Sequence, residues 1–209
     1  MNALRKPWYL SLIIYLIWEI VIMRVEYLPF IVHHRPLYQF EDKCIEFRKL
    51  VAIIFFPGAI SYLKWWPQIG WKGLYNKRGR IFLGLKLQDL RFLWLPILFF
   101  LIQILSVLFT DLKPTQVLVY VVINTLMAGI REELMFRGIL FHGASSSFGI
   151  WRAAWITSII FGARHALNGF INGNFNASIL QAFCAFMFGF YMVALRVRLD
   201  TIIPGIIIH

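Results

Sequence analysis

The feature that most constrains this chain is a series of apolar runs, each close to the roughly 20 residues that a helix needs to cross a bilayer. The 209 residues are 60% hydrophobic, whereas a soluble domain has roughly 45–50%. The mean hydropathy is +0.70. The sequence therefore predicts an all-α, polytopic membrane protein whose side chains are buried in lipid or among helices.

The apolar runs predict six full transmembrane helices and the start of a seventh. The segment 24–49 mixes acidic and basic residues, so we expect a loop with an interfacial helix there. No internal repeat or low-complexity tract is visible, which predicts a single transmembrane domain over residues 1–209. The expected spans lie near residues 8–23, 50–66, 92–109, 116–140, 151–167 and 178–195, and from 201 to the end.

The net charge of +11 comes from 21 Lys and Arg residues against 10 Asp and Glu residues. These basic residues gather beside the apolar runs, above all in 67–91, which is typical of cytoplasmic loops facing anionic lipid headgroups. We therefore expect the lipid bilayer as a partner, no nucleic acid, and a cytoplasmic N-terminus. Cys44 and Cys184 lie in different settings and form neither a disulfide framework nor a metal-binding spacing.

One stretch, "AGIREELMFRGILFH" at 128–142, concentrates charges inside an apolar run. An ionisable residue in a membrane span is costly and is by default a functional candidate. Glu133 and Arg137 are four residues apart, in the order that favours an ion pair on one helix face. Glu132 is rotated by about 100° from Glu133, so we expect it to lack a cation of its own and to face a cavity as a general base. A purely structural network is the alternative.

Two histidines also fall within apolar spans. Phe161 and His165 are four residues apart and share a helix face, and His209 follows the last apolar run. A histidine in a span can equally serve as a hydrogen-bonding residue between helices, and that alternative stays open. Glu19 lies in the first apolar run; it could pair with Arg24 or reach toward the interface, and we assign it no role.

Three motifs in order, Glu-Glu-x-x-x-Arg at 132–137, Phe-x-x-x-His at 161–165 and a later His209, resemble the signature of the CPBP family. This family comprises the CAAX proteases and bacteriocin-processing (Abi) enzymes, including the Ras-converting CAAX endopeptidase. The resemblance covers about residues 115–209. It implies an intramembrane endopeptidase in which Glu132 and His165 activate water and His209 stabilises the oxyanion, while Glu133, Arg137 and Phe161 support the site.

The resemblance leaves the use of a metal open, since members of the family have been called both metalloproteases and glutamic proteases. Glu132, His165 and His209 could form a three-ligand zinc site. In that case Glu133 would have to leave its arginine to act as the base. We therefore expect no cofactor and keep zinc as the alternative. The family pattern continues with a polar residue four positions after the last histidine, so we expect the chain ending at His209 to be a fragment rather than an inactive, truncated member.

The resemblance implies a membrane-associated peptide or protein substrate, processed as a CAAX end or as a leader or bacteriocin precursor, and a multi-pass protein of the bacterial inner membrane. Two other functions remain open. A proton-coupled transporter would also use buried Glu and His residues, although the repeat typical of such carriers is not visible. A non-catalytic scaffold or immunity protein would need the helices but not the hydrolysis.

Overall fold

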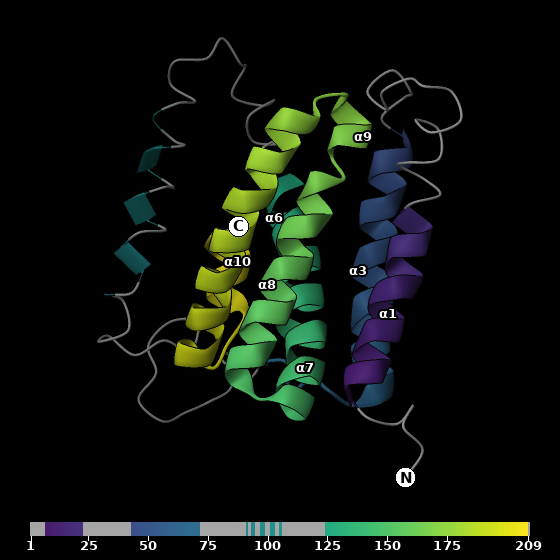
Figure 1. Cartoon of the computed structure of the whole chain (residues 1–209). Helices are drawn as coiled ribbons and strands as arrows, with labels where there is room; N and C mark the ends of the chain where they lie inside the picture. The colour runs from purple at the N-terminus through teal and green to yellow at the C-terminus, as the bar shows by residue number, and fades with distance from the viewer. Residues whose placement is uncertain are drawn as a thin grey trace.

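The computed structural model describes residues 7–22, 43–71 and 124–208, with scattered positions between 91 and 105. These ranges are helical and contain no strand, as the fold class predicts (Figure 1). The elements are α1 (Pro7–Ile22), α3 (Lys43–Leu63), α6 (Asn124–Glu132), η8 (Glu133–Leu140), α7 (Phe141–Phe148), α8 (Ile150–Ala166), α9 (Gly169–Asn172), α10 (Phe175–Leu199) and α11 (Ile203–Ile208).

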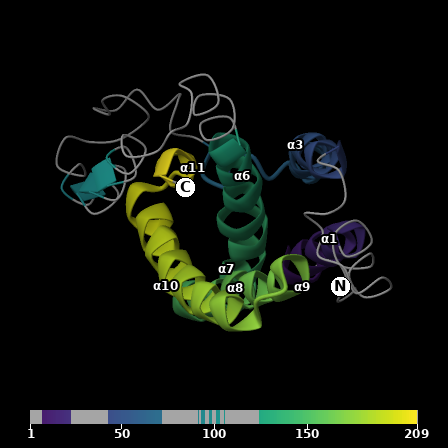
Figure 2. The same cartoon turned by 90° about the horizontal axis from the view of Figure 1, so that it is seen from above.

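The centre of the molecule is the continuous helical run α6–η8–α7. Seen from above, α10, α8 and α1 form an arc around this run, and α11 and α3 lie on either side of α6 (Figure 2). All eight residues of η8 are buried. Glu133 and Arg137 are therefore enclosed, because their segment contacts α1, α3, α8 and α10.

The segment η8 is a π-helix, which is rare in proteins and is often found at functional sites. Its wider turn is visible at the end, where the Phe141 N–H donates to the carbonyl of Phe136, five residues earlier, as well as to that of Gly138. The run ends at Gly149, whose φ of 82° turns the chain into α8. A side chain at this position would be strained, because a positive φ is tolerated mainly by glycine.

Glycines allow close contact between neighbouring helices, as the sequence suggests. A methyl group at Gly162 of α8 would lie 2.8 Å from the backbone oxygen of Ala182 in α10. Gly143 of α7 packs in the same way against Ser11 of α1. The Ser11 hydroxyl donates a hydrogen bond of 2.9 Å to the carbonyl of Ile139, so α1 is fixed to the central run at this point.

A second connection joins the end of α10 to the segment after α3. Arg196 donates to the carbonyl of Gln68 at 2.9 Å and to Asp200 at 3.2 Å, and its guanidinium lies on Gly70. The Ile202 N–H donates to the carbonyl of Gly70. These contacts set the direction in which the chain enters α11, which packs on α6.

The prediction of six full spans is not confirmed. Within the described ranges one helix, Phe175–Leu199, is long and apolar enough to cross a membrane, and Pro7–Val21 and Ile54–Leu63 are shorter apolar helices. The physical reason lies in the charges of the central run and in the two arginines of α8, which interrupt otherwise apolar segments. Most of the predicted span 92–109 and most of the predicted loop 24–49 lie outside the described residues.

Candidate active site

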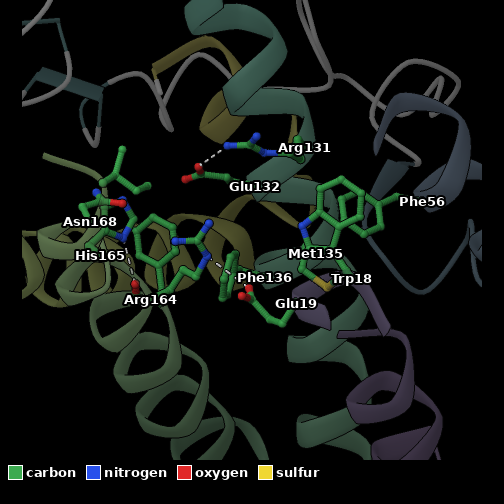
Figure 3. Close-up of a pocket in the computed structure, with 12 residues that line it drawn as sticks. Trp18, Glu19, Phe56, Arg131, Glu132, Met135, Phe136, Arg164, His165 and Asn168 are labelled. Carbon is green, nitrogen blue, oxygen red and sulfur yellow. Dashed lines mark hydrogen bonds and ion pairs between the residues drawn. The ribbon is translucent and has the colours of Figure 1, made fainter. Parts of the chain in front are cut away.

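A cavity of about 220 Å³ lies between the central run, α1, α3 and α8 (Figure 3). Its wall combines aromatic side chains with two acids, two arginines, a histidine and an asparagine. The structure thus brings Glu132 and His165, which are 33 residues apart in the sequence, to one polar cavity. The lining residues are Trp18, Glu19, Phe56, Arg131, Glu132, Met135, Phe136, Phe161, Arg164, His165, Asn168 and Ile171.

Glu132 faces this cavity as expected, but the expectation that it lacks a cation of its own is wrong. Arg131 donates a hydrogen bond of 2.9 Å from Nη2 to Glu132 Oε1, and both side chains are 17% exposed. Neighbouring residues on a helix do not normally face each other. Here both long side chains bend into the same cavity, and the positive charge of Arg131 balances the negative charge of Glu132.

The predicted contact between Glu133 and Arg137 is present. Arg137 Nη1 lies 3.0 Å from Glu133 Oε1, and each side chain is 1% exposed. Gly205 of α11 closes this pair from one side, since a methyl group there would lie 2.5 Å from Glu133 Oε2. The pair is therefore sealed between the central run and α11, away from the cavity that Glu132 lines.

Phe161 lies between this sealed pair and His165. The guanidinium of Arg137 sits 4.3 Å from the centre of the Phe161 ring, a cation–π geometry. The edge-on contact between the Phe161 and His165 rings has a centroid distance of 4.6 Å. Phe161 is 2% exposed and packs against both the buried Arg137 and the histidine at the cavity.

The tautomer of His165 follows from a single hydrogen bond. His165 Nδ1 lies 2.9 Å from the carbonyl oxygen of Phe161. A carbonyl oxygen can only accept, so Nδ1 carries the proton and donates it. In the neutral ring Nε2 is then the nitrogen with the lone pair, which can accept a proton or a hydrogen bond from water.

A second ion pair lies at this cavity, and the spacing of the motifs does not predict it. Arg164 Nε lies 3.2 Å from Glu19 Oε1, and both side chains are 15% exposed. The proposed alternative partner of Glu19, Arg24, lies outside the described residues. The sequence offered two signals for this pair, namely an acidic residue in the first apolar run and an arginine directly before His165.

Asn168 is a further polar residue at the cavity that the motifs do not include. It lies three residues after His165, where α8 has ended, and it donates a hydrogen bond of 2.9 Å to Gln181 of α10. Its position follows from this connection between the two helices. The sequence offered one signal for it, a polar residue close behind a histidine of interest.

His209 lies outside the described residues, so the three predicted catalytic residues are not all placed. Within the described ranges, no group of three or more His, Cys, Asp or Glu residues is arranged to hold a metal. A carboxylate and an imidazole at one cavity can together hold a water molecule and remove its proton.

The fold and the site define a class, a helical protein with a carboxylate and an imidazole at a cavity between its helices. Residues 114–209 match the family model described as "Type II CAAX prenyl endopeptidase Rce1-like". Over this segment, which is somewhat less than half of the chain, the sequence is similar to the CAAX proteases, a family of membrane-embedded peptide hydrolases. No curated protein and no solved structure matches the chain.

Proposed function

We propose that the protein is a multi-pass intramembrane endopeptidase that hydrolyses a peptide bond of a membrane-associated substrate with water activated by Glu132. One observation carries the proposal: Glu132 and His165 line the same cavity. The His165 tautomer leaves Nε2 as its basic nitrogen. The match to the family model adds the class of reaction and supports a CAAX-type substrate over a leader or bacteriocin precursor.

In the proposed mechanism a water molecule is held by the Glu132 carboxylate and by His165 Nε2. Glu132 takes one proton of this water. The water oxygen attacks the scissile carbonyl carbon at the same time, and a tetrahedral oxyanion forms. The same proton then passes to the leaving amide nitrogen as the C–N bond breaks, and Glu132 returns to its ionised form. His209 is assigned to the oxyanion by the resemblance alone.

We favour a mechanism without a metal, and the packing of Glu133 supports this choice. A zinc site that used Glu132 as a ligand would require Glu133 to act as the base. Glu133 is instead held by Arg137 at 3.0 Å in a position that is 1% exposed. Moving it would leave a guanidinium without its carboxylate in the interior, which is strongly unfavourable.

The test measures cleavage of quenched fluorescent peptides by the full chain in detergent micelles and in liposomes. One peptide has a farnesylated CAAX end, one has the same end without the lipid, and one is a leader-type peptide. We expect E132Q to lower kcat by about 10²–10⁴-fold, the usual contribution of a general base. H165N should also lose activity, because asparagine keeps a donor near the Phe161 carbonyl but has no equivalent of Nε2.

D200N is the matched control, since Asp200 pairs with Arg196 away from the cavity. Its φ of 54° is one that asparagine tolerates. Wild-type turnover in E132Q with all three peptides would rule out the proposed function. Activity that is lost with a chelator and restored by zinc would replace the metal-free mechanism with the zinc alternative.

A further inference from the structure

The ion pair between Glu19 and Arg164 connects the candidate site to a part of the chain outside the family match. Glu19 belongs to α1, whereas the family model covers residues 114–209. Its carboxylate lies 3.2 Å from Arg164 Nε, and both side chains line the cavity. The helix α1 therefore contributes a charged residue to the same cavity as Glu132 and His165.

The two ion pairs of the cavity form one electrostatic group. In the view of Figure 3, the Arg164 guanidinium is drawn between the carboxylates of Glu132 and Glu19, and the contact that is marked goes to Glu19. Glu19 also interacts electrostatically with Arg131, the partner of Glu132. Among the described residues that line the cavity, two acids face two arginines; Arg131 contacts Glu132, and Arg164 contacts Glu19.

The contact of Arg164 with Glu19 matters for Glu132, the proposed base. A carboxylate accepts a proton from water through the lone pairs of its oxygens. A guanidinium has several N–H donors, and its hydrogen bonds to a carboxylate occupy those same lone pairs. Glu132 already accepts one hydrogen bond from Arg131. If Glu19 were neutral, Glu132 would be the ionised carboxylate left among the described lining residues, and Arg164 would turn toward it, because charges in a low-dielectric site seek the opposite charge.

We propose that Glu19 is a positioning residue of the site, which holds Arg164 toward α1 and so keeps its guanidinium away from the Glu132 carboxylate. The inference rests on the proposed function. A positioning role for Glu19 also explains why the first apolar run contains an acidic residue, although a neutral residue there would cost less free energy to bury. A simple ion-pair link between α1 and α8 is the competing explanation, and the two differ in what removal of Arg164 does.

The decisive experiment is a double-mutant cycle in the peptide cleavage assay, with kcat and KM measured separately for E19Q, R164Q and E19Q/R164Q. We expect E19Q to lower kcat by about tenfold or more, as expected when a catalytic group is misplaced, with little change in KM. R164Q removes the guanidinium that Glu19 controls, so E19Q should have little further effect in that background. The double variant should therefore be more active than E19Q alone.

A structural link predicts the opposite, since a broken contact is not repaired when its second partner is removed. Equal kcat for E19Q and E19Q/R164Q would thus overturn the inference, as would a wild-type kcat for E19Q. E19D should keep part of the activity because it retains the charge, and D200N is again the control for loss of an acid elsewhere. Should E19Q fold poorly, R164Q alone decides the matter: the proposal expects a kcat near the wild-type value, whereas a structural link expects the loss that any broken contact causes, and such a loss would contradict the proposal.

Failure of the inference can be told apart from failure of the proposed function. If the wild type cleaves and E132Q does not, but E19Q behaves as the wild type, the inference alone is wrong. If E132Q cleaves as the wild type does, the protease mechanism is wrong and the role of Glu19 is overturned with it.

Discussion

Glu132 and Glu133 are adjacent in the sequence and belong to different environments. Glu133 contacts Arg137 in a region that is 1% exposed and is closed by Gly205. Glu132 contacts Arg131 at a polar cavity where both are 17% exposed. Two identical side chains thus have different surroundings, because the helix directs one into the packed interior and the other into the cavity.

The difference also shows how a buried charge can be kept in place. The π-helical segment begins at Glu133, so the change of helix type falls between the two glutamates. Residues on one side of this boundary are enclosed by α8, α10 and α11, while Glu132 stays at the wall of the cavity. The ion pair predicted from α-helical spacing forms all the same, because two long side chains can span the wider turn.

The largest effect is expected when Glu133 is removed. E133A leaves Arg137 buried without this carboxylate, which should lower the free energy of unfolding by about 3–5 kcal/mol. The matched variant E132A should cost about 1 kcal/mol or less, since Arg131 keeps some exposure. Thermal unfolding in detergent measures both. Similar losses in the free energy of unfolding for E133A and E132A would mean that the two ion pairs contribute equally to stability despite their different burial.

A smaller effect is expected at Gly205, which closes the sealed pair. In G205A the new methyl group would meet the Glu133 carboxylate at 2.5 Å, so we expect a loss of about 1–3 kcal/mol from overpacking. Gly58 of α3 is the control, because a methyl group there has no neighbour within 4 Å. G58A should leave stability unchanged or raise it slightly, since alanine favours a helix. Equal melting temperatures for the two variants would contradict this account of Gly205.

The smallest effect on stability is expected for F161L, which tests whether the sealed pair supports the cavity. Leucine keeps most of the apolar volume but loses the cation–π contact with Arg137, worth about 0.5–2 kcal/mol. It also loses the edge contact with His165. We expect a modest drop in melting temperature and a larger relative drop in kcat. The reverse, lost stability with unchanged kcat, would show that Phe161 is a packing residue only.

The helical class and most of the helices could be predicted from the apolar runs. The predicted segments 8–23, 151–167 and 178–195 correspond closely to α1, α8 and α10. The prediction that the fourth span ends at 140 was less accurate, because the central run continues through α7 to Phe148. The last turns of α7 carry the exposed serines Ser146 and Ser147, and a count of apolar residues ends a span where such polar residues begin.

Contacts at the candidate site could be predicted where they depend on local spacing. The contact of Glu133 with Arg137 and the shared face of Phe161 and His165 follow from positions four residues apart. The contact of Glu19 with Arg164 joins residues that are 145 positions apart, and no periodicity encodes such a contact. The cation beside Glu132 was missed for another reason, since neighbouring side chains were expected to diverge.

The sequence by itself determined that this chain is helical, that its charges are concentrated in one apolar run, and that three motifs follow in the order of a protease family. These properties depend on residue type and on spacing along one helix, which a chain carries in any conformation. Only the tertiary structure decided that Arg131 balances Glu132 at the cavity and that Arg164 contacts Glu19, because these contacts depend on how α1 and α8 pack around the central run.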